Sequence, residues 1–191
     1  MRASVAEEVR QALARHPRKT VAEPSLKPAG VLLVVYAKDE DHSVLLNKRT
    51  ELVEHHKGEI SFPGGSMDDD DESLLHTALR ETHEEMGIDP SDVEMLGQLE
   101  DMPTISNFLI STFVATIPYP YDFKPSEIEV AEVLEVPISH LRSEQSWRDE
   151  ARFHNRELQV SRSYVYQGHV IFGATAKVLA NFLKLVEDAP L

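Results

Sequence analysis

The sequence predicts one α+β, or mixed α/β, domain, in which a β-sheet packs against a few separate helices. Short apolar runs rich in β-branched residues recur between residues 31 and 136, as is typical of strands. Residues 73–86 and 174–186 instead carry apolar residues at helical spacing. A chain of 191 residues suits one hydrophobic core. We therefore expect a single domain over 1–191, with an N-terminal helix and linker over 1–28 and a core over 29–187.

The composition excludes several classes of protein. The net charge of −14 disfavours binding to nucleic acid or to anionic membranes. The absence of cysteine excludes disulfides, thiolate metal sites and cysteine nucleophiles. No apolar run approaches the roughly 18 residues of a membrane span, and the N-terminus lacks the apolar stretch of a signal peptide. We expect a cytoplasmic protein with a small-molecule partner, and a homodimer stays open.

The elements follow from local patterns. Apolar residues at helical spacing between Val5 and Leu13 predict a short N-terminal helix, which Pro17 ends. Residues 17–28 contain three prolines and are expected to form an extended linker. Residues 31–36 are typical of a buried strand, and residues 43–48 of its hairpin partner. Further strands are expected at 93–99, 109–117 and 130–136, with two shorter ones flanking 154–156.

The helix over residues 73–86 has clear boundaries in the sequence. Asp70 and Asp71 are candidates for its N-cap, because acidic side chains complement the positive end of a helix dipole. Gly87 can adopt the left-handed conformation that ends a helix, and Ile88 can supply the closing apolar contact. Pro90 prevents the helix from restarting.

This helix has two distinct faces. At about 100° per residue, one stripe is expected to face the core and consists of Leu75, Ala78, Leu79, Thr82 and Met86. Glu81, Glu84 and Glu85 are expected to cluster on the far side. Neighbouring carboxylates repel each other by roughly 0.2–0.5 kcal/mol per pair, and a divalent cation such as Mg²⁺ would reverse that sign. Spacing alone also fits a solvated, glutamate-rich surface, since Glu is a strong helix former.

The segment before this helix adds a second motif. Phe62-Pro63-Gly64-Gly65 is typical of a turn at which the backbone approaches a ligand closely. Together with this turn, the helix resembles the signature of the Nudix family in residue type and spacing, through Gly65, Glu72, Arg80, Glu81, Glu84, Glu85, Gly87 and Ile88. The spacer from Gly65 to Glu72 is one residue longer than usual, as in the coenzyme A-type branch of that family.

Residues upstream resemble the same branch. Its motif is matched in spacing by Leu45-Leu46-Asn47-Lys48-Arg49-Thr50, then Glu54, Gly58 and Phe62-Pro63-Gly64-Gly65. Asn47 replaces a threonine of the branch, and Thr50 replaces a serine or alanine. Glu54 replaces an arginine, which puts recognition of the 3′-phosphate of coenzyme A in question. The resemblance covers roughly residues 30 to 185.

The resemblance implies a Nudix fold, with a mixed β-sheet sandwiched between helices, and the use of Mg²⁺ or Mn²⁺. It points to Glu81 and Glu85 as the principal metal ligands and to Glu84 as a further one. The backbone around Gly65 is expected to contribute a carbonyl. Glu72 and Arg80 are expected to form an orienting pair, although a plain surface ion pair would fit them as well.

The general base is left open among three residues. Glu85 fits, as do Glu129 and Glu132, although the last two also fit ordinary charges at a strand edge. Arg49, Lys57 and His56 are candidates for binding substrate phosphate, together with Gly64 and Gly65. His55 and His56 fit equally well as polar loop residues.

The implied reaction is attack of water on a pyrophosphate bond in a nucleotide derivative, giving two monophosphates. Coenzyme A or one of its derivatives is the leading substrate class, with 3′,5′-ADP and 4′-phosphopantetheine as products. Glu54 keeps other substrates open, such as ADP-ribose, NADH or a dinucleoside polyphosphate. A Nudix-fold binding module without catalysis is a second alternative, but such modules typically lose acids that this helix retains.

Overall fold

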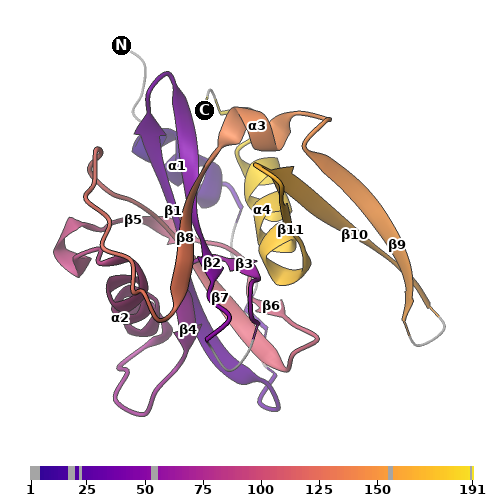
Figure 1. The fold of residues 1–191 in the computed structure, drawn as a ribbon, viewed down its shortest axis with the longest axis horizontal. Helices are drawn as coiled ribbons and strands as arrows, with labels where there is room; N and C mark the ends of the chain where they lie inside the picture. The colour runs from indigo at the N-terminus through magenta and orange to yellow at the C-terminus, as the bar shows by residue number, and fades with distance from the viewer. Residues whose placement is uncertain (1–4, 17–19, 22, 53–55, 155–156, 190) are drawn as a thin grey trace.

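The computed structural model describes residues 5–16, 20–21, 23–52, 56–154, 157–189 and 191. Its described helices pack around a large mixed sheet, and a smaller sheet extends to one side (Figure 1). The helices are α1 (Val5–Ala14), α2 (Leu74–Met86), α3 (Ile138–Arg142) and α4 (Gly173–Leu185), with a short 3₁₀ helix η1 (Pro90–Asp92). No helix in the described part of the chain is long and apolar enough to cross a lipid bilayer.

The large sheet is mixed, because β1 runs parallel to β7 while its other described pairings are antiparallel. Its described strands are β1 (Lys27–Lys38), β2 (Asp41–Arg49), β3 (Ile60–Ser61), β4 (Gly64–Ser66), β5 (Glu94–Gln98), β6 (Met102–Pro103), β7 (Phe108–Thr116) and β8 (Val130–Pro137). The strand order is β3-β2-β1-β7-β5. Strand β8 lies outside this series and pairs with β2. The strands expected between residues 31 and 136 are thus confirmed.

Helices cover both faces of this sheet, as predicted. Alternate residues of β1 divide between two clusters, with Leu33 and Val35 on one face and Leu32 and Val34 on the other. The first cluster includes residues of α1 and α4, and the second includes residues of α2. Buried apolar side chains therefore fix α2, which carries the acidic motif, against one face of the sheet.

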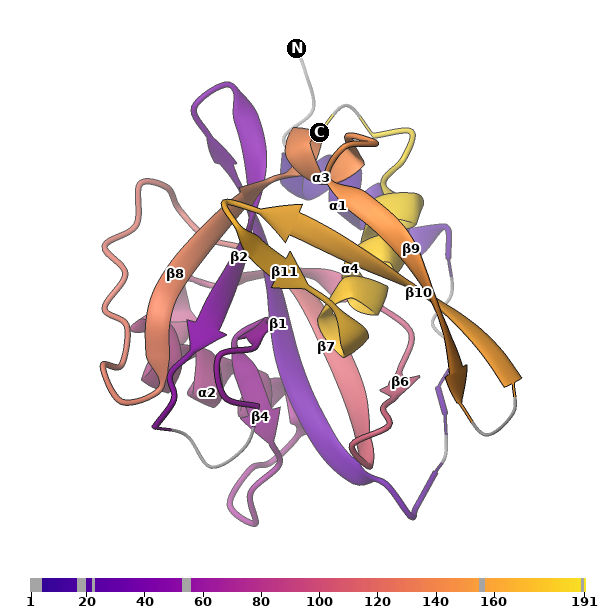
Figure 2. The ribbon, with the colours of Figure 1, turned by 45° about the vertical axis from the view of Figure 1, so that its right-hand side comes forward.

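The small sheet consists of β9 (Trp147–His154), β10 (Glu157–Tyr166) and β11 (His169–Ile171). The β9–β10 hairpin reaches away from the body of the domain (Figure 2). The prediction of two short strands here is wrong, because β9 has 8 residues and β10 has 10. Cross-strand contacts support the extra length, since the Arg162 guanidinium lies 3.6 Å from the centre of the Trp147 ring and bonds to Asp149 at 2.9 Å.

Three local expectations need correction. Strand β1 begins at Lys27, inside the segment expected to be a linker, because residues 27–30 already pair with β7. The Gly64-Gly65 pair belongs to strand β4, which pairs with β1, and is not a plain turn. The N-cap of α2 is Ser73, whose side chain accepts a hydrogen bond from the His76 N–H. The left-handed Gly87 at the other end, with φ of 68°, is as predicted.

Candidate active site

Glu85 lies on the side of helix α2 that faces the sheet, with 2% of its surface exposed. The prediction that all three glutamates cluster on the side of the helix away from the core is therefore wrong for Glu85. Glu84 is exposed and Glu81 is half-buried. The acidic side of the helix lies over β2 and β4. The solvent exposure of its carboxylates therefore varies, from exposed Glu84 to buried Glu85.

Three donors hold the Glu85 carboxylate. Asn47 Nδ2 donates to Oε2 at 3.0 Å, the Gly64 N–H donates to Oε2 at 3.1 Å, and Arg49 Nη1 donates to Oε1 at 3.2 Å. Burial raises the pKa of Glu85 to about 7, and the Gly64 bond and Arg49 only partly offset it. The negative charges of Glu81 and Glu129 raise this pKa further. Glu85 is thus a buried carboxyl that is costly to ionise without an added cation.

The two glycines of β4 are required by close contacts. A Cβ atom at Gly65 would lie 2.5 Å from Cδ of Glu81. Gly64 has a φ of +145°, and a Cβ atom there would lie 2.4 Å from the Gly30 carbonyl oxygen. The bare backbone therefore lets β4 lie directly beneath Glu81 while the Gly64 N–H points to the site. Burial also raises the pKa of Glu81.

Arg80 organises the outer part of the site, but with a different partner from the one predicted. Its Nε and Nη2 donate to the two carboxylate oxygens of Asp71, both at 2.9 Å. This replaces the expected pair with Glu72, which is exposed. Arg80 Nη1 also bonds Glu81 at 3.0 Å and Glu84 at 3.3 Å. The bond from Arg80 holds the pKa of Asp71 well below its usual range, despite burial of that carboxyl.

The loop before β8 brings Glu129 toward these acids. Its backbone ends helix α2, because the Lys124 N–H bonds the Met86 carbonyl and the Ser126 N–H bonds the Glu85 carbonyl, both at 2.9 Å. The Glu129 carbonyl then accepts the Thr50 N–H at 2.9 Å, next to Arg49. The Glu129 charge acts on both Glu81 and Glu85.

Glu132 is placed differently. It lies two residues into β8, where its carboxylate oxygen Oε2 is 3.0 Å from Nε2 of His169 on β11. The structure thus separates two residues that the sequence left equivalent. Glu129 belongs to the acidic group, and Glu132 belongs to the contact between the two sheets.

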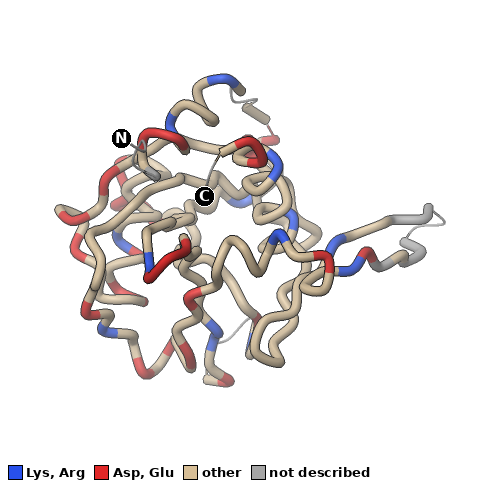
Figure 3. Tube along the Cα trace, turned by 90° about the horizontal axis from the view of Figure 1, so that it is seen from above, with Lys and Arg blue, Asp and Glu red and all other residues tan. Residues whose placement is uncertain are grey.

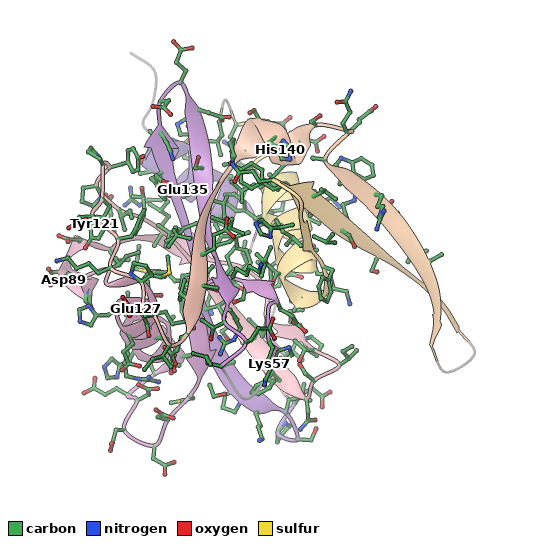
Figure 4. All side chains as sticks on the ribbon, viewed as in Figure 1. Lys57, Asp89, Tyr121, Glu127, Glu135 and His140 are labelled. Atoms are coloured by element: carbon green, nitrogen blue, oxygen red, sulfur yellow. The ribbon has the colours of Figure 1, made fainter. Side chains whose placement is uncertain are left out.

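Among the predicted phosphate-binding residues, some lie at the acidic group and others lie away from it. Arg49 contacts Glu85 directly, as described above. Lys57 and His56 are exposed on the loop between β2 and β3, where His56 pairs with Glu59 at 2.9 Å (Lys57 is labelled in Figure 4). Glu54 and His55 lie outside the described residues. The contacts therefore bring Arg49, rather than Lys57 or His56, to the buried acid.

The carboxylates suit a hard divalent cation in their chemistry, although they are not drawn together in advance. Within the described ranges, no three acidic or histidine side chains form a converged metal-binding group. Glu84 turns to Arg80 and Glu85 is bonded by Arg49, which accounts for the separation. The donors are nevertheless oxygen atoms, and Gly65 leaves open backbone beside Glu81. The residue set therefore supplies the kind of ligand that Mg²⁺ or Mn²⁺ prefers.

Two other surface features do not coincide with this site. A cavity of about 590 Å³ lies at the C-terminal end of α2, beside Gly87, Tyr121 and Lys124, and none of the three glutamates lines it. Figure 3 shows Asp and Glu residues distributed around the body of the domain rather than gathered on one face. The acidity of the whole chain therefore does not mark the site, and the buried contacts of Glu85 do.

Sequence reasoning gave no functional role to Asn47, Ser61 or Asp71. Asn47 was noted only as a departure from a threonine, and Asp71 as a helix cap. A signal for Asn47 existed, because residues two apart in a strand share a face. Leu45 packs on the α2 side of the sheet, so Asn47 and Arg49 follow on that side. A polar residue at such a buried position needs a partner.

Comparison with known proteins agrees with this fold. The NUDIX domain family profile matches residues 26–158. An uncharacterized Nudix hydrolase, NudL, from Pectobacterium atrosepticum is 32% identical, over 87% of this chain and 90% of that protein. NudL from Yersinia enterocolitica is 35% identical, over 83% and 80%. The crystal structure of the Nudix hydrolase RenU from M. smegmatis, 19% identical, superposes with a TM-score of 0.58 over 86% and 88%. This chain belongs to the Nudix family, as a hydrolase that acts on pyrophosphate bonds of nucleoside diphosphate derivatives.

Proposed function

We propose that this hydrolase cleaves the pyrophosphate bond of coenzyme A or a coenzyme A derivative, which for coenzyme A itself gives 3′,5′-ADP and 4′-phosphopantetheine. The observation that carries the proposal is the contact between Arg49 and buried Glu85. It joins the upstream motif, which resembles the coenzyme A-type branch, to the acidic helix in one site. A cation for phosphate thus lies beside the carboxylates that would hold a metal ion.

The carboxylates of Glu81 and Glu85 would hold the divalent cation, and Glu84 would be a further ligand. A bound Mg²⁺ would neutralise phosphate charge and assist both water activation and departure of the leaving phosphate. Arg80 orients Glu81 and Glu84 from outside, through the bonds at 3.0 and 3.3 Å. Arg49 binds a substrate phosphate oxygen, exchanging its contact with Glu85 for the ligand.

Glu129 is the general base in this proposal. It lies on a loop anchored to Thr50, and its charge reaches both Glu81 and Glu85. Its carboxylate would take the proton of the attacking water. Glu132 is not used, because it pairs with His169 on the neighbouring sheet.

A panel of nucleotide derivatives tests the substrate class. Products are identified by mass spectrometry after incubation with Mg²⁺, with Mn²⁺ and with a chelator. Coenzyme A compounds should give 3′,5′-ADP or 5′-AMP together with 4′-phosphopantetheine, and the chelator should stop the reaction. Faster turnover of ADP-ribose, NADH or a dinucleoside polyphosphate would transfer the site to that substrate and refute the coenzyme A proposal.

A matched pair of variants tests the base. Glu129→Gln should lower kcat by about 100-fold or more, in line with the usual contribution of general base catalysis. Glu132→Gln, the control on the same segment, should leave kcat within about twofold, since general base catalysis is intact there. Equal losses in both variants would remove Glu129 from this role.

The substrate within this class depends on Glu54. An acidic residue at the position of the branch arginine should repel a 3′-phosphate, so we expect the wild type to prefer dephospho-coenzyme A. Glu54→Arg should shift the ratio of kcat/KM toward coenzyme A by about tenfold, and high salt should weaken the shift. Measuring both substrates with both proteins at two salt concentrations tests this, and an unchanged ratio would refute an electrostatic role for Glu54.

A further inference from the structure

We propose that Asn47 is a positioning residue that occupies one oxygen of the Glu85 carboxylate and leaves the other, Oε1, for the divalent cation. The inference rests on the function proposed above, since it assigns Glu85 as a metal ligand. It adds a division of labour between the two oxygens of one side chain. The residues that enforce it, Asn47 and Ser61, lie outside the acidic helix.

Asn47 is held from both sides in the sheet. It is fully buried on β2, directly opposite Ser61 of β3. Ser61 Oγ donates to Asn47 Oδ1 at 2.7 Å, and Asn47 Nδ2 donates to Glu85 Oε2 at 3.0 Å. An ionised carboxylate can only accept, so the amide nitrogen must face Glu85, and Ser61 secures this orientation from behind.

The bonds to Glu85 are distributed unequally. Each carboxylate oxygen has about two acceptor positions. Among the described residues, Oε2 accepts from both Asn47 and the Gly64 N–H, at 3.0 and 3.1 Å, and is therefore filled. Within the same described ranges, Oε1 accepts only from Arg49, in the longest of the three contacts, at 3.2 Å. One acceptor position on Oε1 therefore stays open within the described part of the chain.

The choice of residue at this position supports the same role. The branch that this sequence resembles has threonine here, whose hydroxyl is one bond closer to the main chain. Asparagine reaches farther and carries its donor and its acceptor on two separate atoms, so it can bridge Ser61 and Glu85. Loss of the bridge would let the carboxylate rotate and offer Oε2 or neither oxygen. Partners of metal ligands that act in this way typically change metal affinity or activity by about 10- to 100-fold.

The test measures metal binding separately from turnover. Mn²⁺ binding to the full chain is followed by electron paramagnetic resonance or calorimetry, and kcat and KM are determined at saturating Mn²⁺. Asn47→Leu, which keeps the size and removes both bonds, should weaken Mn²⁺ binding by about 10- to 100-fold. It should lower kcat while KM changes by less than about twofold, because Arg49 still binds phosphate. Asn47→Thr should recover part of the loss.

Ser61→Ala supplies a milder variant in case Asn47→Leu does not fold. It frees the amide without removing it, so Mn²⁺ binding should weaken by a smaller factor in the same direction. Ser111→Ala is the control, because Ser111 is also a sheet serine whose hydroxyl donates to another side chain, Asp101, at 2.6 Å. It should cost stability and leave the Mn²⁺ affinity unchanged.

The outcomes separate the two proposals. Wild-type Mn²⁺ affinity in folded Asn47→Leu or in Ser61→Ala, with weakened binding in Glu85→Gln, would overturn the positioning role alone. Wild-type Mn²⁺ affinity in Glu85→Gln would instead overturn the metal site on which both proposals rest. Equal weakening in Ser61→Ala and Ser111→Ala would show a general effect of destabilising the sheet and would also overturn the role of Asn47.

Discussion

Replacing Glu85 by glutamine should stabilise the metal-free protein while abolishing its activity. A carboxyl whose pKa rises from 4.5 to about 7 on folding loses about 3 kcal/mol of folding free energy once it ionises. Because the pKa of Glu85 is raised in the folded state, the contribution of this residue to stability is greatest below pH 4.5. The protein loses that stability as the pH rises through 7. Glutamine does not ionise and escapes this loss.

The stability gained by Glu85→Gln is smaller than the roughly 3 kcal/mol that ionisation of Glu85 costs. Glutamine can offer its oxygen to Asn47 and Gly64, but its NH₂ group then faces the guanidinium of Arg49. A mismatched buried contact of this kind costs about 1–2 kcal/mol. We therefore expect Glu85→Gln to be more stable than the wild type by about 1–2 kcal/mol at pH 8. In a chain of this size, that difference raises Tm by roughly 3–6 °C.

Thermal unfolding in the presence of a chelator, at pH 5 and pH 8, measures this difference. The advantage of the variant should be present at pH 8 and absent at pH 5. Adding Mg²⁺ should stabilise the wild type more than the variant, because binding to the folded state alone raises stability. If Glu85→Gln is less stable than the wild type at pH 8 without metal, Glu85 ionises without cost and the reasoning fails.

Two further perturbations probe the surroundings of the helix. Gly65→Ala adds a methyl group 2.5 Å from Cδ of Glu81 and should displace that carboxylate, lowering kcat by about 10- to 100-fold in a steady-state assay with little change in Tm. A wild-type kcat would show that Glu81 can move freely. Asp71→Asn removes the charge that accepts both bonds from Arg80, and should lower the free energy of unfolding by about 1–3 kcal/mol at pH 7. Because the pKa of Asp71 is lowered in the folded state, its ionised carboxylate stabilises the fold at pH values above the usual pKa of Asp. This stability is lost as the pH falls through the lowered pKa. The denaturation curves of variant and wild type should therefore converge in strong acid.

The sequence was informative where one residue type satisfies a local requirement. Gly87 ends α2 because a left-handed residue is needed there, and Ile88 is buried as the closing contact. The continuous apolar run over residues 31–36 likewise predicted a buried strand, and β1 is covered on both faces. These features depend on neighbours along the chain, and all of them are confirmed.

The sequence was less informative where partners are distant along the chain. Asp71 and Glu72 are adjacent acids, and only the packing of α2 decides that Arg80 meets Asp71. Glu85 was expected on the side away from the core with Glu84, because helical spacing gives relative angles but not how the helix packs on the sheet. Its contact with Asn47 spans 38 positions and could not be seen in a local pattern.

The loop from residue 118 to 129 both ends helix α2 and positions Glu129. The same backbone that closes the end of α2 through Lys124 and Ser126 also carries Glu129 to Thr50. Insertions or deletions within it would move both together, whereas the β1–β2 turn at Asp39 and Glu40 has no such double attachment among the described contacts. In chimeras between Nudix proteins, this loop and α2 should therefore be exchanged as one block, with one crossover point before α2 and the other in β8.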